Sequence, residues 1–492
     1  MNLTLILDLA VSGHPDRLAV TQGGGRLTFA DLDRRARAVA AGLVHAGARA
    51  VLHVGPSSTA LPVALFAAAR AGIPFVPLNY RLSDEQLDRL VAEHPQSLVV
   101  HDGRRPSTAT GPTVHRDELA SWGGTPELAP EAPADGDVIA VLLYTSGTTA
   151  APKAAVLRHR HLMAYLFATV EFGAAALEEA ALVTVPPYHV AGVTNLVSNL
   201  YAGRRIVYLD AFDPASWLDT VRTHGVTQAM VVPTMLARLV DHLGEAATAA
   251  TPTLRSIAYG GARMPLPVLQ RALALFPDAG FVNAYGLTET SSTIAVLGPD
   301  EHREAVASDD PDVRARLGSV GRLVPGVELE VRDDDGNVLS DGTPGLLFLR
   351  GEQVSGEYVG SSGVDADGWF ATRDRGWVDA AGYLFIEGRA DDTIIRGGEN
   401  IAPAEIEDVL AEHPGVTEAA VLGLPDDEWG QRVAAVVVPA SGAVVDADEL
   451  RAWVRTRLRS SKTPDVIEFR TELPRTDTGK LLRRELLAEL VP

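Results

Sequence analysis

Residues 138–170 read "VIAVLLYTSGTTAAPKAAVLRHRHLMAYLFATV". The first seven residues are apolar and partly β-branched, which is typical of a buried strand, whereas residues 158–170 have the composition of a helix. Between them lies a loop of small polar residues that leads to one cation. The candidate ligand-binding residues of this loop are Thr145, Ser146, Gly147, Thr148, Thr149 and Lys153.

A strand, loop and helix of this composition can wrap a polyphosphate. Backbone N–H groups and hydroxyls donate hydrogen bonds to phosphate oxygens, and a lysine supplies positive charge. The loop is not a Walker loop, because the pattern G-x-x-x-x-G-K-[ST] is absent from the sequence. Composition alone leaves a second interpretation open, namely a Ser/Thr-rich turn on the surface.

The rest of the chain alternates short apolar runs with helix-length segments. Residues 97–101 and 205–209 carry strand signals, and residues 29–47 carry a helix pattern. This alternation predicts an α/β fold in which helices cover largely parallel strands. At 492 residues the chain is too long for one core, because single cores stop growing near about 250–300 residues.

The sequence pattern changes at two places along the chain, and these changes suggest domain boundaries. Between about 320 and 387, apolar and polar residues alternate around Asp/Gly turns, which predicts a β-rich subdomain of antiparallel hairpins. After "GRADD" (388–392) the chain carries a separate set of helix and strand signals, long enough for a small domain. We therefore expect a large N-terminal domain of layered α/β sheets at 1–389 and a small α+β domain at 390–492.

Composition narrows the range of partners. The 43 Lys and Arg residues face 64 Asp and Glu residues, and the resulting net charge of −21 repels nucleic acid and anionic lipid. No apolar run reaches the roughly 18–20 residues of a membrane span, and the N-terminus lacks the basic region of a signal peptide. Cysteine is absent, which excludes disulfides and Cys-ligated zinc. These features favour a soluble cytoplasmic protein without a nucleic-acid partner.

The string "YTSGTTAAPKAA" (144–155) resembles the phosphate loop of the acyl-adenylate-forming superfamily, which includes acyl-CoA ligases, aryl-CoA ligases, luciferases and the adenylation domains of peptide synthetases. The family pattern is Tyr-Thr-Ser-Gly-Thr-Thr-Gly-x-Pro-Lys-Gly, and Ala150 and Ala154 stand where the family usually has glycine. Other segments resemble family motifs in the family's order. These segments are 66–83, 185–192, 259–265, 283–290, 369–392, 394–407 and 474–486.

The resemblance implies a binding site for ATP. Beside the phosphate loop, it implies that Tyr285 lies over the adenine base and that Asp374 and Arg389 lie at the ribose. The further positions that it implies at the nucleotide or the acyl group are Gly261, Ala262, Asn283, Ala284, Gly286, Gly397, Gly398 and Glu399.

The catalytic residues that the resemblance implies are Lys480, Thr288, Glu289 and His189. Thr288 would contact the phosphates, Glu289 would bind Mg²⁺, and His189 would border the acyl pocket. Chemistry agrees with these roles, because attack of a carboxylate on the α-phosphate builds up negative charge that a metal ion and a lysine can meet. The implied cofactors are ATP, Mg²⁺ and coenzyme A.

The resemblance also implies two half-reactions in one pocket. A small-molecule carboxylic acid first becomes an acyl-AMP with release of pyrophosphate, and the acyl group then passes to a thiol, that of coenzyme A. Between the two steps the small domain would swing about Asp391 as a hinge. This movement would exchange Lys480 for the segment Gly397–Gly398–Glu399–Asn400.

Two alternatives stay open. The acyl group could pass to a separate carrier protein, or the adenylate to another nucleophile, as in some secondary-metabolism members of the family. The chain could instead be a nucleotide-binding relative that has lost adenylation, an idea that only Ala150 and Ala154 support. A further departure is Arg373, which precedes Asp374 where glycine is common; all three departures are either neutral or alter nucleotide use.

Overall fold

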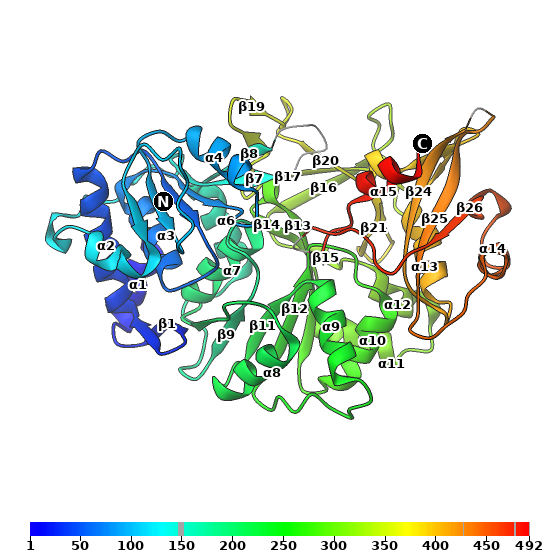
Figure 1. Ribbon diagram of the computed structural model, residues 1–492, viewed down its shortest axis with the longest axis horizontal. Coiled ribbons are helices and arrows are strands. Elements are labelled where there is room, and N and C mark those ends of the chain that lie inside the picture. Colours follow the sequence, from blue (N-terminus) through cyan, green and yellow to red (C-terminus); the bar gives the residue numbers. More distant parts are fainter. Residues whose placement is uncertain (146–151, 427, 477–478, 492) are drawn as a thin grey trace.

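The computed structural model describes residues 1–145, 152–426, 428–476 and 479–491. Figure 1 shows a large domain, coloured blue to yellow, and a small C-terminal domain, coloured mainly orange and red, at one side of it. Two large sheets form the framework of the large domain, and helices cover them. The expected α/β fold class is confirmed.

The first sheet has nine strands in the order β15-β14-β13-β12-β11-β9-β10-β1-β2. The strands from β13 through β1 run parallel to their neighbours, and antiparallel strands close both ends. Their bounds are β1 Leu18–Gln22, β2 Gly25–Thr28, β9 Ala180–Val183, β10 Arg205–Tyr208, β11 Gln228–Val231, β12 Ser256–Gly260, β13 Gly280–Leu287, β14 Ser292–Leu297 and β15 Arg322–Leu323.

The second sheet has eight strands in the order β19-β18-β8-β7-β4-β3-β5-β6. Strands β7, β4, β3, β5 and β6 are parallel, and β8 and β18 continue the sheet in antiparallel fashion. Their bounds are β3 Val51–Val54, β4 Phe75–Leu78, β5 Leu98–His101, β6 Thr113–His115, β7 Ile139–Thr145, β8 Lys153–Arg158, β18 Glu357–Tyr358 and β19 Ser361–Ser362.

Helices of the large domain fill the space between and around the sheets. The predicted helix at 29–47 is α2, which begins at Phe29 behind a capping box made by Thr28 and Asp31. The bounds are α1 Thr4–Gly13, α2 Phe29–His45, α3 Ala60–Ala71, α4 Asp84–Ala92, α5 Leu119–Trp122, α6 His159–Thr169, α7 Val190–Tyr201, α8 Pro214–Thr223, α9 Pro233–Leu243, α10 Leu266–Leu275, α11 Pro299–Ala307 and α12 Pro311–Ala315.

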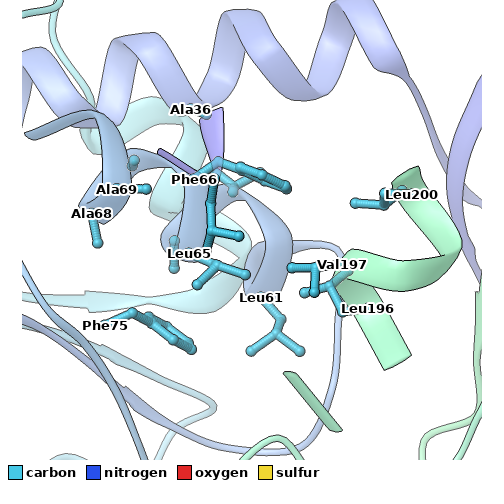
Figure 2. Packing of buried hydrophobic residues seen from close by; sticks show 14 of the residues in the cluster. Ala36, Leu61, Leu65, Phe66, Ala68, Ala69, Phe75, Leu196, Val197 and Leu200 are labelled. Atoms are coloured by element: carbon cyan, nitrogen blue, oxygen red, sulfur yellow. The ribbon is translucent and has the colours of Figure 1, made fainter. Parts of the chain in front are cut away.

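Helix α3 lies in the core and is almost entirely apolar; its one charged residue, Arg70, is buried and pairs with Asp8 and Asp33. Figure 2 shows its Leu61, Leu65 and Phe66 beside Phe75 of β4 and the apolar residues of α7. Each fully buried side chain of this size contributes about 1.5–3 kcal/mol through removal of apolar surface from water. No helix in the described part of the chain is both long and apolar enough to cross a membrane.

The structure contains a β-rich subdomain, as the expected fold class requires. It contains a four-stranded antiparallel sheet in the order β16-β17-β20-β21. Its strands are β16 Val327–Arg332, β17 Gly345–Gly351, β20 Phe370–Val378 and β21 Leu384–Arg389. The short strands β18 and β19 leave this subdomain and join the second large sheet through β8, which ties the subdomain to the phosphate loop.

The C-terminal domain is α+β, as expected. It has a two-stranded and a three-stranded sheet, the latter in the order β24-β25-β26. Its elements are β22 Ile394–Arg396, β23 Glu399–Ile401, α13 Pro403–Ala411, β24 Val416–Asp426, β25 Gly430–Pro439, α14 Ala447–Arg455, β26 Val466–Phe469 and α15 Arg483–Leu490.

One local prediction is wrong. The chain does not pass from the phosphate loop into a helix, because Lys153 begins β8, which pairs antiparallel with β7 before α6 starts at His159. Ala155, Val156 and Leu157 are buried on the sheet, and this burial favours a strand between the loop and the predicted helix, which follows as α6. Strands β7 and β8 therefore pair as neighbours, with Thr145 opposite Lys153.

The three departures from the family pattern differ in their backbone setting. Ala154 lies in β8 opposite Tyr144, so an extended backbone accepts alanine there and glycine would relieve no strain. Ala150 lies outside the described residues. Arg373 has φ +63°, in the left-handed region that favours glycine. It lies in a bulge of β20, where Leu346 and Phe348 of β17 face Arg375 and Ala371.

The left-handed conformation of Arg373 predicts a specific stability effect. Valine is β-branched and adopts positive φ poorly, so Arg373→Val should lower the free energy of unfolding by about 1–2 kcal/mol relative to Arg373→Gly. Urea unfolding of both variants gives this difference. Ala371→Val, on the same strand, serves as the control and should be nearly neutral, because valine suits an extended strand. Equal stability of the two valine variants would contradict a left-handed backbone at residue 373.

Candidate active site

The carboxyl ends of β12 and β13 create one side of the candidate site. The two strands are parallel, with Gly260 opposite Ala284, so the segments that follow them reach the same edge of the sheet. A side chain at 260 would come within 2.2 Å of the Ala284 carbonyl oxygen, and one at 286 within 1.7 Å of the Ser292 carbonyl oxygen, so only glycine fits. This geometry brings together the predicted residues Gly261, Ala262, Asn283, Ala284, Tyr285 and Gly286.

A buried carboxylate, that of Asp374, lies next to these strand ends. Its side chain is 8% exposed, it accepts a hydrogen bond from the Tyr285 hydroxyl at 2.5 Å, and its other oxygen lies 3.1 Å from Arg389 Nε. Burial raises the pKa of Asp374, while Arg389 and the Tyr285 hydroxyl oppose the rise. Burial and the Asp374 charge together raise the pKa of Tyr285, so this hydroxyl keeps its proton.

The bulge in β20 orients Asp374. The Thr372 hydroxyl donates to the Leu347 carbonyl oxygen at 2.9 Å and accepts from the Asp374 N–H at 3.0 Å. Arg389, the last residue of β21, pairs in register with Asp374 and donates to the Thr372 carbonyl oxygen at 2.8 Å. Bulges commonly redirect a side chain in this way, and here the result is a carboxylate held by a cation and a phenol.

Glu289 forms a second acidic position, in the short 3₁₀ helix η3 (Thr288–Thr290) directly after β13. Its carbonyl oxygen accepts hydrogen bonds from the N–H groups of Ser355 and Gly356, at 2.8 and 3.0 Å. Its carboxylate accepts a hydrogen bond from the Tyr358 hydroxyl. Lys153 Nζ lies 5.7 Å from the centre of the Tyr358 ring, so this tyrosine joins the phosphate-loop lysine to Glu289.

Glu289 is suited to bind a metal ion that is also coordinated by the phosphates of a nucleotide. Among the described residues, no group of three or more His, Asp or Glu side chains is arranged to hold an ion. Mg²⁺ in nucleotide sites is commonly held by one or two carboxylates together with substrate phosphates. Glu289, with Thr288 beside it and Lys153 nearby, meets that requirement.

Of the phosphate loop, the structure describes only the two ends. The Thr145 hydroxyl donates to the Lys153 carbonyl oxygen at 3.3 Å, which links the ends of β7 and β8. The other predicted residues of the loop, Ser146, Gly147, Thr148 and Thr149, lie outside the described part of the chain.

Lys480 reaches the same region from the C-terminal domain. It interacts electrostatically with Asp374 and Glu289 of the large domain, and burial together with the Arg389 charge lowers its pKa. Gly479 lies against Thr234 at the start of α9, where an added Cβ would be 2.3 Å from the threonine hydroxyl. Its φ of +79° also favours glycine, so the residue before Lys480 allows the close approach of the two domains.

The turn at Gly397–Gly398 is elsewhere in the C-terminal domain. It joins β22 to β23 with φ values of +57° and +82°, the two positive values of a type I′ hairpin turn. Gly397 lies against the Trp429 ring, and Glu399 forms an ion pair with Arg459 at 2.8 Å. These contacts lie within the C-terminal domain, so the structure brings Lys480, rather than this turn, to the carboxylates of the large domain. The Asn400 backbone pairs with Ile395.

The two remaining predicted residues, His189 and Asp391, lie in connecting segments. His189 directly precedes α7, and its ring centre lies 4.6 Å from that of Tyr188, which in turn contacts Tyr80. Asp391 lies in the short 3₁₀ helix η5 (Ala390–Asp392), which connects β21 to the C-terminal domain. Arg373 Nη1 is 3.8 Å from the Asp391 carboxylate, so the residue at the unusual φ faces the connection between the domains.

Sequence reasoning missed two residues of this region. These are Tyr358, which binds Glu289, and Thr234, which lies against Gly479; no feature of the sequence marked either as a site residue. Each is brought to its partner only by the tertiary fold, because that partner is more than 60 positions away in the chain.

Comparison with known proteins agrees with this geometry. Residues 7–359 match the AMP-binding enzyme family, and residues 405–480 match the AMP-binding enzyme C-terminal domain. The chain is 36% identical to a feruloyl-CoA synthase of Amycolatopsis sp, with 96% of both chains covered. It is 34% identical to the fatty acid–[acyl-carrier-protein] ligase ScoC of Streptomyces coeruleorubidus, with 96% of this chain and 93% of the other covered.

A solved structure shows the same arrangement of elements. It is that of O-succinylbenzoate coenzyme A synthetase (MenE) from Bacillus subtilis in complex with ATP and magnesium ion. The TM-score is 0.85, the identity is 28%, and 98% of both chains is covered. On the two family matches and the extent of these relatives, the chain belongs to the AMP-binding, acyl-adenylate-forming enzyme family and contains both of its domains.

Proposed function

We propose that this protein joins a small carboxylic acid to a thiol in two steps that share one site. In the first step ATP and the acid give an acyl-AMP and pyrophosphate, and in the second the acyl group passes to coenzyme A. The observation that supports this most is the convergence of Lys480 with Asp374 and Glu289, one cation and two carboxylates from two domains. Because the reaction consumes ATP and coenzyme A, we also propose a cytoplasmic location.

The first step needs cations at the α-phosphate. When the acid oxygen attacks phosphorus, the new P–O bond forms as the bond to pyrophosphate breaks, and negative charge spreads over the phosphate oxygens. Lys480 would stabilise that charge, and Lys153 with the N–H groups of the phosphate loop would hold the outgoing pyrophosphate. A Mg²⁺ ion held by Glu289 and Thr288 would neutralise the phosphates when bound.

The nucleoside would be held by the groups around β13. Asp374 can accept hydrogen bonds from both ribose hydroxyls, because a carboxylate offers two oxygens, and Arg389 opposes the rise in its pKa that burial causes. Tyr285 would cover the adenine base. His189 at the start of α7 would border the acyl group. The remaining backbone positions at the nucleotide are Gly261, Ala262, Asn283, Ala284 and Gly286.

The second step would use another domain orientation. We assign residues 1–389 to the large domain and 390–492 to the small one, with Asp391 as the hinge. Turning about this hinge would withdraw Lys480 and bring in the turn Gly397–Gly398–Glu399–Asn400, whose glycines leave room for the thiol carrier. Movements of this kind are a general way to use one pocket for two reactions.

A second acceptor is favoured by one comparison. The fatty acid–[acyl-carrier-protein] ligase ScoC covers nearly the whole chain, so a phosphopantetheine thiol on a separate carrier protein is the alternative to coenzyme A. Loss of adenylation is not supported, because Glu289, Asp374 and Lys480 are all present, and Ala154 lies in an extended strand that accepts alanine.

The decisive experiment is ATP–pyrophosphate exchange with a panel of aryl, fatty and dicarboxylic acids, followed by product analysis with coenzyme A or a carrier protein. We expect exchange with at least one acid and thioester formation with coenzyme A. Exchange without coenzyme A thioester would favour the carrier protein, and absence of exchange with every acid would contradict the proposal.

Glu289 offers a test of the metal site. Glu289→Gln keeps an oxygen for the Tyr358 hydroxyl but removes the negative charge, so exchange should fall at least about 10²-fold while the free energy of unfolding changes by no more than about 1 kcal/mol. The measurements are exchange across a range of Mg²⁺ concentrations and urea unfolding. Glu352→Gln, an exposed residue in the neighbouring loop, is the control. Near-normal exchange at saturating Mg²⁺ would refute the assignment.

Lys480 offers a test of the division between the two steps. Lys480→Ala should lower exchange by about 10²–10³-fold, because it removes a cation that acts in the transition state of adenylation. Single-turnover transfer from synthetic acyl-AMP to coenzyme A should be unchanged, because Lys480 would then be remote. Arg484→Ala removes an exposed cation from α15 and should affect neither step. Equal loss in both steps would argue against domain exchange.

A further inference from the structure

The boundary between the two domains is polar. Each hydrophobic cluster in the described part of the chain belongs to one domain: two clusters lie wholly within residues 394–490, and the cluster of the β-rich subdomain lies within residues 285–386. Burial of shared apolar surface therefore does not fix the position of the C-terminal domain. Polar contacts must do so, which is typical of domains that move relative to one another.

An ion pair crosses this boundary away from the hinge. The Arg263 guanidinium, in the segment that follows β12, binds the Asp408 carboxylate of α13. The two side chains are 45% and 49% exposed, so water screens the pair. Exposed pairs of this kind change an equilibrium constant by a factor of up to about five. A contact of that strength can bias a domain position and still open in every catalytic cycle.

Arg263 is next to the contact made by the Lys480 segment. Strands β11 and β12 are parallel neighbours; Thr234 follows β11 and meets Gly479, and Arg263 follows β12 and meets Asp408. The C-terminal domain therefore contacts two adjacent strand ends of the same sheet, at two different parts of its own surface. Beyond the covalent hinge, two separate contacts restrict rotation as well as distance.

The surroundings of Asp408 make its partner important. Partial removal from water raises the pKa of the half-exposed Asp408 carboxylate to about 6, Arg263 opposes the rise, and the carboxylates of Glu407, Glu412 and Glu405 add to it. Glu405, Glu407 and Glu412 have cationic partners within the C-terminal domain, in Lys462, Arg483 and Arg457. Without Arg263, docking would bring the Asp408 carboxylate to the boundary without its ion-pair partner. Loss of the arginine alone should therefore disfavour docking more than loss of the aspartate alone, since an unpaired charge at an interface is costly.

We propose that Arg263 and Asp408 are positioning residues for adenylation: their ion pair holds the C-terminal domain in the orientation in which Lys480 reaches the α-phosphate. The pair must separate when the domain turns for thioester formation. It therefore sets the balance between the two half-reactions. This inference rests on the two-step function proposed above.

The test is a double-mutant cycle of Arg263→Met and Asp408→Asn. Exchange should fall about two- to fivefold in Arg263→Met and less in Asp408→Asn, and the double variant should resemble Asp408→Asn because the unpaired carboxylate is gone. Single-turnover transfer from synthetic acyl-AMP to coenzyme A should be equal to or faster than that of the unmodified enzyme in all three. Arg303→Met breaks an exposed pair with Asp300 inside the large domain and serves as the matched control.

A readout independent of activity separates this idea from the proposed function. Because the chain has no cysteine, Leu128→Cys and Val444→Cys allow specific fluorophores to be attached at exposed positions, one in each domain. Energy transfer between them should report a smaller docked population in Arg263→Met than in Arg303→Met, and recovery in the double variant. An unchanged population, or an equal loss of both half-reactions, would overturn the proposal even if the enzyme adenylates its acid. Absence of any exchange in the unmodified enzyme would refute the function instead.

Discussion

A buried carboxylate with two close partners, that of Asp374, organises the candidate site. Burial alone would favour its neutral form, so the surrounding structure has to supply a cation and a donor, and it does so with Arg389 and the Tyr285 hydroxyl. These partners come from the last residue of β21 and from β13. The contacts of Asp374 thus connect the nine-stranded sheet to the β-rich subdomain. They lie close to residue 390, where the C-terminal domain begins.

The backbone around Asp374 also helps to hold this carboxylate in place. The bulge in β20 lets Thr372 bind both β17 and the Asp374 N–H, and it forces Arg373 into a left-handed conformation. A glycine at 373 would avoid that strain, so the arginine is an unfavourable choice locally. Its side chain lies 3.8 Å from Asp391, which puts a cation at the connection between the domains. Local strain and an interdomain contact therefore coincide at one residue.

Much of the fold could be predicted because local signals and burial agree. The strands at 98–101 and 205–208, the helix of Phe29–His45 and the hairpins of the β-rich subdomain all follow from periodicity and turn residues. The failure at residues 153–158 is instructive. "KAAVLR" has no strong strand signal, and its conformation is decided by pairing with β7 and by burial of Ala155 and Leu157, which are tertiary effects.

In the candidate site, too, some residues could be predicted from the sequence and others depend on tertiary contacts. The order of motifs indicated which residues to bring together, and Gly261, Tyr285, Asp374, Glu289 and Lys480 do lie around one boundary. Among the residues that hold this set, Tyr358, Thr234 and Asp408 lie outside the family motifs, and Arg263 lies inside one, 259–265, that did not indicate its partner. A residue that only has to meet a distant partner leaves no periodic pattern in its own segment. Such contacts can be weak and still decide the outcome. In the proposed mechanism the C-terminal domain takes two orientations in every turnover and needs nearly equal free energies in both. A factor of a few from one exposed ion pair would then be comparable to the whole difference between them. Strong apolar docking would fix the first orientation and stop the second step, which gives a physical reason for a boundary built from polar groups.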